Sequence, residues 1–166
     1  MSPEGSSDRA AIDSVLMRYY RGIDRTDFDL VRSCFFDDAE LDYGPWFQGG
    51  LDDFISYAEG PTGLAGQDRT FHFAGNTIID IDGDRAHSEV YVMAQHWSAD
   101  AHEWAGAFVT TWLRYIDRFE RRKDGWRIAS RQVVIEAIRQ DTAGMWLDVP
   151  PSASGRRDRT DIVYAR

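Results

Sequence analysis

Two Asp-Gly dipeptides divide the second half of the chain, and each is typical of a tight hairpin turn between two strands. Asp82-Gly83 and Asp124-Gly125 separate long runs of strand-like residues, and a further turn is expected around Ala99 to His102. The predicted strands are Thr70 to Ile81, Arg85 to Ser98, Trp104 to Arg121 and Trp126 to Arg139. They form an antiparallel meander, and at least two exceed the usual length of about five or six residues. Because long strands coil, we expect a strongly curved sheet.

The N-terminal part of the chain predicts two helices in succession. The first is expected to begin near Asp8, with Ser6 or Ser7 as its cap. Its apolar positions recur at helical spacing: Ile12, Val15, Leu16, Tyr19, Tyr20 and Ile23. Thr26 with Asp29 resembles a capping box for a second, short helix. The apolar residues of that second helix are Phe28, Val31 and Phe35.

The connection between these two helices is only a few residues long and contains Asp24. Beyond the second helix, Ala39 to Tyr43 alternates as a strand does and stops at Gly44-Pro45. A brief helix around Phe54 and a glycine-rich loop from Gly60 to Gln67 follow. The order of elements is therefore helix, helix, strand, short helix and a four-stranded meander.

These elements predict one α+β domain over residues 8–140. We expect a cone-shaped, curved sheet, mixed but mainly antiparallel, enclosed by three helices. Residues 1–7 are expected to be flexible, and residues 141–166 to form a C-terminal arm. The apolar residues of this arm are Trp146, Leu147, Val149, Ile162, Val163 and Tyr164. The arm is either a solvated tail or a segment that packs on a neighbouring subunit or over a pocket mouth.

Charge and cysteine content limit the classes of partner. In the 166 residues, 28 acidic side chains outnumber 19 basic ones, and the net charge of -9 argues against nucleic-acid binding. The single cysteine, Cys34, cannot form an internal disulfide, so a reducing cytoplasm is expected, and its apolar neighbours place it in the core. The N-terminus does not resemble a signal peptide, and no apolar run approaches the roughly 18 residues of a membrane span. We therefore expect a soluble, cytoplasmic protein that binds no membrane.

The histidines are the candidates for acid–base chemistry: His72, His87, His96 and His102. Strand alternation puts His87 and His96 on opposite faces of their strand. His72 shares a small, mostly apolar face with Ala74, and His102 falls in a turn. The chain has no His-x-His pair, cysteine cluster or glycine-rich phosphate loop, so neither a metal nor an organic cofactor is expected.

Three segments resemble a known family: Tyr19-x-x-x-x-Asp24, Phe71-His72-Phe73-Ala74-Gly75-Asn76 and Asp124-Gly125-Trp126. With the order of elements, they resemble the SnoaL-like branch of the nuclear transport factor 2-like (cystatin-like) fold, over about Asp8 to Arg139. That branch includes scytalone dehydratase, a bacterial bile-acid dehydratase and hexachlorocyclohexane dehydrochlorinase. Because the fold also includes cyclases, isomerases and non-catalytic subunits, the fold alone does not define a function.

The resemblance implies roles for five side chains. The spacing of Asp24 and His72 is similar to that of an Asp/His dyad in this branch, with His72 as general base and Asp24 as its orienting partner. Tyr19 falls where the bile-acid enzyme carries a catalytic tyrosine. Tyr43 and His96 fall near a tyrosine and a second histidine of scytalone dehydratase.

A second group of residues is expected to contact the substrate. Arg131 falls near an active-site arginine of the dehydrochlorinase and would hold an anionic or carbonyl substrate, or else face solvent or pair with an acid. Trp46, Phe73 and Trp112 are aromatic residues expected to line the site. Tyr20 is the helical neighbour of Asp24 and stays open as an alternative to Tyr19.

The resemblance implies a cofactor-independent, dehydratase-type lyase that acts on a small, largely apolar cyclic molecule. Isomerase or polyketide-type cyclase chemistry in the same pocket is the first alternative. A non-catalytic ligand-binding or accessory subunit is the second. Relatives with this dyad are commonly trimers, so a homo-oligomer is expected, with a trimer favoured over a dimer.

Overall fold

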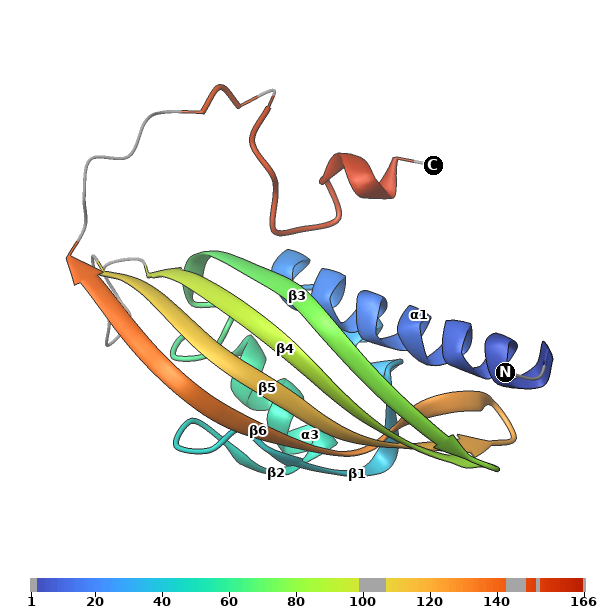
Figure 1. Ribbon diagram of the computed structural model, residues 1–166. Coiled ribbons are helices and arrows are strands. Elements are labelled where there is room, and N and C mark those ends of the chain that lie inside the picture. The colour runs from blue at the N-terminus through green and yellow to red at the C-terminus, as the bar shows by residue number, and fades with distance from the viewer. Residues whose placement is uncertain (1–2, 99–106, 143–148, 152, 166) are drawn as a thin grey trace.

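Six strands form one curved sheet that does not close on itself, with three helices packed against it (Figure 1). The structure is a computed structural model that describes residues 3–98, 107–142, 149–151 and 153–165. The helices are α1 (Pro3–Arg25), α2 (Phe28–Arg32) and α3 (Leu51–Glu59), with a 3₁₀ turn at Ile162–Tyr164. The strands are β1 (Phe35–Asp42), β2 (Gln48–Gly50), β3 (Gln67–Asp82), β4 (Arg85–Ser98), β5 (Ala107–Arg122) and β6 (Gly125–Thr142).

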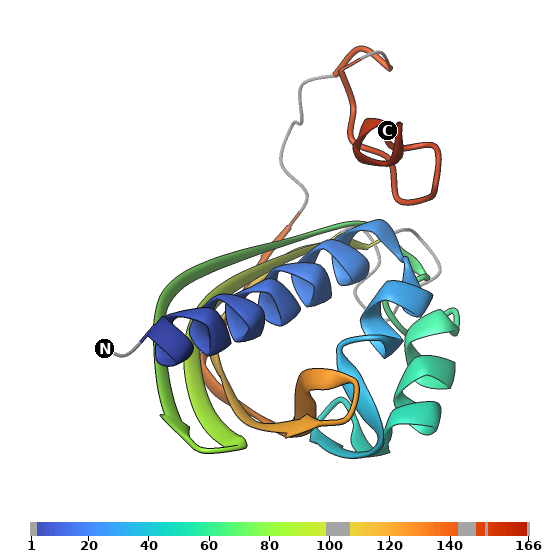
Figure 2. The ribbon, with the colours of Figure 1, turned by 90° about the vertical axis from the view of Figure 1, so that its right-hand side faces the viewer.

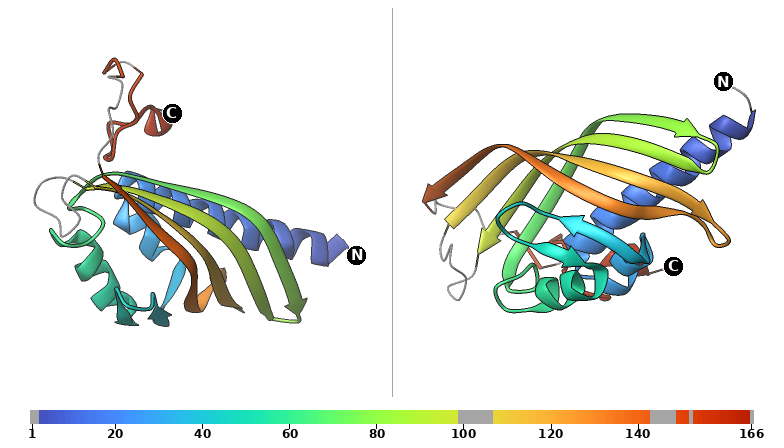
Figure 3. Two further views of the ribbon diagram at one scale, coloured as in Figure 1. Left: turned by 60° about the vertical axis from the view of Figure 1, so that its left-hand side comes forward. Right: turned by 90° about the horizontal axis from the view of Figure 1, so that it is seen from below.

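The strand order is β2-β1-β6-β5-β4-β3, in which β1 and β6 are parallel and all other neighbours antiparallel. The sheet bends around α1, and α3 lies on the side away from β3 and β4 (Figure 2). Two further views show the bend along the four long strands (Figure 3). The predicted fold class, a curved, mainly antiparallel sheet with three helices, is confirmed.

The meander follows from its turn residues. Both predicted hairpins are present, and Gly83 (φ 59°) and Gly125 (φ 95°) adopt the left-handed conformation that tight turns require. The predicted turn at Ala99 to His102 and the predicted strand start at Trp104 lie outside the described residues, as do Trp146 and Leu147. Among the described residues, none of the helices has both the length and the apolar character needed to cross a bilayer.

Helix α1 begins earlier than the sequence predicted. It starts at Pro3, so the predicted start near Asp8, with Ser6 or Ser7 as cap, is wrong, and most of the segment expected to be flexible is helical. Proline fits the first turn of a helix because the backbone N–H that it lacks has no partner there. The apolar face of α1 is buried as predicted.

The connection to α2 also differs from the prediction. Asp27, not Thr26, caps α2, and its side chain accepts a hydrogen bond from the backbone N–H of Leu30 at 3.2 Å. Thr26 has a φ of 50°, which bends the chain sharply after α1. The short helix ends at Arg32, so Phe35, expected on it, instead begins β1. The three-residue strand β2 was not predicted.

Gly22 allows this bend because α2 passes very close to α1. A Cβ atom at Gly22 would lie 2.7 Å from Val31 Cγ2 and 3.2 Å from the carbonyl oxygen of Asp27. We therefore expect Gly22→Ala to lower the free energy of unfolding by about 1–2 kcal/mol, because overpacking outweighs the gain in helix propensity. Urea titration would measure the change. Gly75→Ala is a matched control, since its Cβ would meet nothing nearer than 3.7 Å; equal losses in both variants would contradict the explanation.

Candidate active site

A cavity of about 90 Å³ lies between α1, α3 and the inner face of the sheet. Apolar and aromatic side chains form most of its wall. The lining residues are Tyr19, Ile23, Tyr43, Trp46, Phe54, Tyr57, Gly63, Leu64, Gln67, His72, Ala94, His96, Thr111, Leu113, Tyr115 and Val133. A largely apolar wall with a few converging polar groups is typical of a small-molecule site.

The Asp24 and His72 side chains meet at this cavity. His72 Nδ1 lies 2.8 Å from Asp24 Oδ1, and the backbone N–H of His72 donates to Asp24 Oδ2 at 3.0 Å. Thr70 Oγ1 donates to Asp24 Oδ1, also at 3.0 Å. Asp24 reaches β3 because α1 ends one residue later, at Arg25, beside the start of that strand. The carboxylate is therefore held by a ring nitrogen, a backbone N–H and a hydroxyl.

These contacts determine the ionisation of Asp24 and the tautomer of the neutral His72 ring. Burial acts to raise the pKa of Asp24, but the hydrogen bonds and the nearby charge of His72, with the hydrogen bond from Thr70, lower that pKa below its usual value. The carboxylate is thus ionised near neutral pH and accepts hydrogen bonds only. In the neutral ring Nδ1 therefore carries the hydrogen and donates to Asp24. Nε2 is left as the basic nitrogen of a side chain that lines the cavity.

Tyr19 and Tyr43 also line the cavity, and their hydroxyl oxygens lie 2.8 Å apart. Burial is the main reason that the pKa of each tyrosine is raised well above the usual value. Both hydroxyls are therefore neutral and able to donate. Tyr20 is also buried but is not among the lining residues, so the structure places Tyr19 rather than Tyr20 at the cavity.

His96 faces the cavity beside His72. The two rings are 5.5 Å apart and nearly perpendicular, and His96 Nδ1 lies 2.6 Å from Gln67 Oε1. The amide oxygen of Gln67 accepts from Nδ1–H, which orients the His96 ring. Gln67 had no role in the sequence interpretation, because its position at the start of β3 gave no sign that it faces the cavity.

The sheet register separates the residues that line the cavity from those that do not. His72, Ala94 and Thr111 are directly opposite one another on β3, β4 and β5, and all three line the cavity. Directly opposed residues project from the same face of a sheet. The strand register therefore explains why Thr111 lines the cavity, a role that the sequence interpretation missed.

The next row, Phe73, Met93 and Trp112, projects from the opposite face. Phe73 is 58% exposed and Trp112 is 40% exposed, and neither lines the cavity. The expectation that these two aromatic residues contact substrate is therefore wrong. Trp46, from the connection between β1 and β2, does line it.

Arg131 does not reach the cavity either. Its Nε and Nη2 donate to the two carboxylate oxygens of Asp117 at 2.7 and 2.8 Å, and both side chains are fully buried. The guanidinium lies 4.0 Å from the ring centre of Tyr19 and 4.2 Å from that of Tyr115. The structure thus places Arg131 behind the wall, paired with an acid, and corrects the expectation that it holds substrate.

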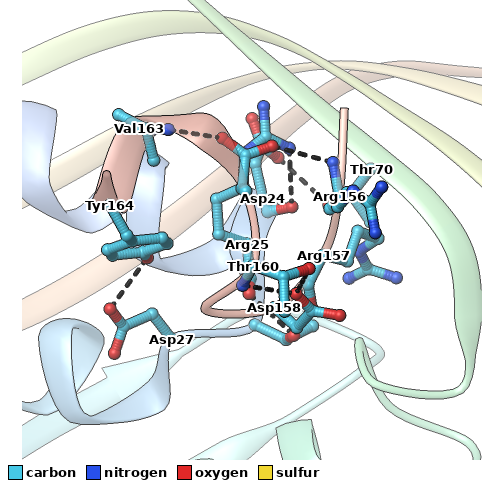
Figure 4. Close-up of polar contacts among 12 residues, drawn as sticks. Asp24, Arg25, Asp27, Thr70, Arg156, Arg157, Asp158, Thr160, Val163 and Tyr164 are labelled. Atoms are coloured by element: carbon cyan, nitrogen blue, oxygen red, sulfur yellow. Dashed lines mark hydrogen bonds and ion pairs between the residues drawn. The ribbon is translucent and has the colours of Figure 1, made fainter. Parts of the chain in front are cut away.

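The described part of the C-terminal arm lies against the body of the domain. Tyr164 Oη donates to Asp27 Oδ2 at 2.8 Å (Figure 4), and Arg157 Nη2 donates to the carbonyl oxygen of Leu64, a cavity residue, at 2.9 Å. The arm therefore contacts a residue of the cavity rim through polar groups. Ile162 is 86% exposed.

Residues with metal-ligating side chains do not gather in the described part of the chain: no group of three or more His, Cys, Asp or Glu there is placed to hold a metal ion. Cys34 is fully buried, and burial raises the pKa of its thiol to about 11. The thiol is therefore unreactive near neutral pH, as expected for a core cysteine.

Comparison with known proteins identifies the family. Residues 4–132 match the model of the SnoaL-like domain. The uncharacterized protein Rv2910c of Mycobacterium tuberculosis (strain ATCC 25618 / H37Rv) is 32% identical over 127 residues, which cover 75% of this chain and 83% of that protein.

Solved structures show the same fold. A protein of Novosphingobium aromaticivorans DSM 12444 assigned as a scytalone dehydratase has a TM-score of 0.73 at 19% identity and covers 94% of this chain and 100% of its own. Hexachlorocyclohexane dehydrochlorinase LinA-type3 from Novosphingobium barchaimii LL02 has a TM-score of 0.69 at 19% identity and covers 87% of this chain and 96% of its own. The resemblance found in the sequence is thus confirmed, and the chain belongs to the SnoaL-like domain family, with the nuclear transport factor 2-like fold.

Proposed function

We propose that this protein is a cofactor-independent lyase of the dehydratase type, with His72 as general base and Asp24 as its orienting partner. The observation that carries the proposal is the 2.8 Å contact between His72 Nδ1 and Asp24 Oδ1 at the edge of an apolar cavity. This contact directs the basic nitrogen, Nε2, to the side of the ring away from Asp24. A similar fold in a dehydratase-type protein and a dehydrochlorinase supports the reaction class.

In the proposed reaction, His72 Nε2 removes a proton from a carbon next to a carbonyl group. The electrons of the broken C–H bond form a carbon–carbon double bond, and the bond from the neighbouring carbon to its hydroxyl group breaks. The departing oxygen takes a proton either from the imidazolium or from Tyr43, which the imidazolium then reprotonates. Water and an unsaturated carbonyl compound leave, and His72 is neutral again.

Asp24 contributes to this step in two ways. It fixes the ring tautomer through Nδ1, and its negative charge stabilises the imidazolium that forms during proton transfer. Tyr19 supports Tyr43 through the hydrogen bond between their hydroxyls. His96, oriented by Gln67, is the second group that can contact the departing oxygen or a carbonyl oxygen.

The cavity supports a small and largely apolar substrate. Its volume of about 90 Å³ is below the ~150 Å³ of a cavity that holds benzene. A substrate with one ring would therefore enter after small shifts of side chains at the rim, such as Leu64 and Trp46. A cyclic molecule carrying one carbonyl and one leaving group matches the apolar wall and the few polar groups.

Two other functions use the same cavity. An isomerase or cyclase would use His72 as base without expelling a leaving group. An accessory subunit would bind a ligand without converting it. We favour the lyase because the solved structures with a similar fold include a dehydratase-type protein and a dehydrochlorinase.

The test is a panel of cyclic ketones that carry a hydroxyl or chloro group on the carbon next but one to the carbonyl carbon. We expect at least one to give the conjugated product, detected by its ultraviolet absorbance. The same incubations in D₂O, followed by mass spectrometry, separate the alternatives. Deuterium uptake without loss of the leaving group would indicate an isomerase, and ligand binding without either change would indicate an accessory subunit.

We also propose that residues 8–140 form the catalytic unit of a cytoplasmic homo-oligomer, with a trimer favoured over a dimer. The apolar side chains on the outer face of the sheet support an oligomer, because such a surface is rarely left uncovered. Those exposed by 40–58% are Phe71, Phe73, Tyr91 and Trp112. The fully buried Cys34 is in keeping with a reducing compartment.

Light scattering would test the assembly. We expect the wild-type protein to have the mass of an oligomer and Trp112→Glu to shift it towards the monomer, because a charge on the outer face opposes burial. Ile162→Glu is the matched variant on the arm, where a shift would indicate that the arm also packs across subunits. A monomeric wild-type protein at micromolar concentration would refute the proposal.

A further inference from the structure

The inner face of the sheet has one small side chain between three polar ones. Ala94 lies directly between His72 on β3 and Thr111 on β5, and His96 is two residues farther along β4 on the same face. All four residues line the cavity, and Ala94, which is 1% exposed, contributes only a methyl group to the wall. The space above Ala94 is therefore bordered by polar groups on β3, β4 and β5.

Thr111 differs from the two histidines because its hydroxyl is unpaired in the described part of the chain. His72 is paired with Asp24, and His96 with Gln67. Thr111 is only 2% exposed, yet its hydroxyl forms no hydrogen bond with any residue that the structure describes. Its oxygen is not one of the unpaired polar atoms that the protein encloses completely, so it is open to the cavity. Because an unpaired polar group in a largely apolar site is unfavourable, this hydroxyl is placed to bind a polar group of a ligand.

The spacing of the strands limits what can lie between His72 and Thr111. Neighbouring strands are about 4.8 Å apart, so the backbones of β3 and β5 are separated by roughly 10 Å at this row. The sheet bends around α1, so the side chains of its inner face converge (Figure 2). A single six-membered ring that lies over Ala94 would thus extend from His72 to the Thr111 hydroxyl.

We propose that the substrate ring lies over Ala94 and that the Thr111 hydroxyl binds an oxygen substituent on the far side of this ring, opposite the carbon that gives its proton to His72. A threonine hydroxyl both donates and accepts, so the substituent is a hydroxyl group or a carbonyl oxygen. The substrate class is then a six-membered cyclic ketone with a further oxygen besides its carbonyl and its leaving group. The role of the carbon beside His72 rests on the proposed function, whereas the contact of Thr111 with a ring substituent does not.

The experiment compares two cyclic ketones that cannot undergo the proposed elimination. 4-Hydroxycyclohexanone has its hydroxyl across the ring from the carbonyl, and 4-methylcyclohexanone has a methyl group of similar size there. Isothermal titration calorimetry gives the dissociation constant of each ketone for the full-length protein. In Thr111→Val, which keeps the shape of the side chain, we expect the hydroxy ketone to lose roughly tenfold in affinity relative to the methyl ketone. The reason is that its hydroxyl would then enter an apolar site without a partner.

Thr110→Val is the matched control, because Thr110 is the preceding residue of β5, is also buried and does not line the cavity. It should leave the ratio of the two dissociation constants as in wild type. Ala94→Leu tests the place of the ring: its larger side chain would fill the space above β4, so neither ketone should bind. Thermal unfolding of each variant shows whether the domain remains folded.

A ratio that is the same in Thr111→Val and wild type, or that changes equally in Thr110→Val, would overturn the proposal. So would a wild-type protein that binds neither ketone, or an Ala94→Leu variant that binds both as tightly as wild type does. Failure of the lyase is distinguishable from these outcomes. A changed ratio in a protein that converts none of the test ketones would leave Thr111 in this role and refute the elimination instead.

Discussion

His72→Ala is expected to lower kcat/KM by about 10²- to 10⁴-fold, the usual contribution of a general base. Alanine removes Nε2, and no other described side chain holds a basic nitrogen in the same contact with Asp24. The measurement is the rate of conversion of whichever test ketone the wild-type protein accepts. Circular dichroism should show an unchanged fold, because the His72 side chain lines a cavity.

Asp24→Asn should lower kcat/KM nearly as much. The amide of asparagine can hold the His72 ring in the wrong tautomer, and it carries no charge to stabilise the imidazolium. The double variant should be little worse than either single one, since a group that acts through another loses its effect once its partner is gone.

His87→Ala is the matched control for both variants, because His87 lies on β4 and does not line the cavity. It should retain the wild-type rate. Two outcomes would contradict the dyad: a His72→Ala variant with wild-type turnover, or losses for His72 and Asp24 that multiply in the double variant. Tyr43→Phe should lower kcat/KM less than His72→Ala or Asp24→Asn does. It removes one hydrogen-bond donor and keeps the aromatic packing of Tyr43 on Phe54.

The sequence was informative where local chemistry decides the structure. The Asp-Gly turns define the meander because only a few residue types adopt the backbone conformation of a two-residue hairpin. The apolar face of α1 is buried because helical periodicity alone brings its members to one side. Asp24 and His72 are brought together as the family resemblance implied, and their catalytic role stays a prediction.

The errors arose where the outcome depends on the face of a strand or on a distant partner. Phe73 follows His72 directly in β3, so the alternation that turns His72 inward turns Phe73 outward. Trp112 lies on the same outward face as Phe73 because of the register of β4 and β5. The sequence of one strand does not reveal that register. The contacts of Arg157 join segments that are 90 residues apart, and no local pattern predicts them.

Arg131→Met should lower the free energy of unfolding by about 3–5 kcal/mol, because it leaves Asp117 as a buried charge without its partner. Both side chains are fully buried and joined by two hydrogen bonds. The guanidinium also packs on the rings of Tyr19 and Tyr115, and those contacts are lost as well. Asp117→Leu should cost a similar amount for the same reason. Urea titration would measure all of these losses.

The double variant, Arg131→Met with Asp117→Leu, shows whether the losses in the single variants come from leaving one buried charge without its partner. Replacement of both partners by apolar groups removes the buried charges together, so the double variant should be more stable than either single variant. Arg32→Met is the control for an exposed pair with Asp52 and should cost no more than about 1 kcal/mol. If the losses of the single variants simply add, each residue contributes through contacts other than their pair. In that case Arg131 would support the cavity wall mainly through Tyr19 and Tyr115, and the pair with Asp117 would be secondary.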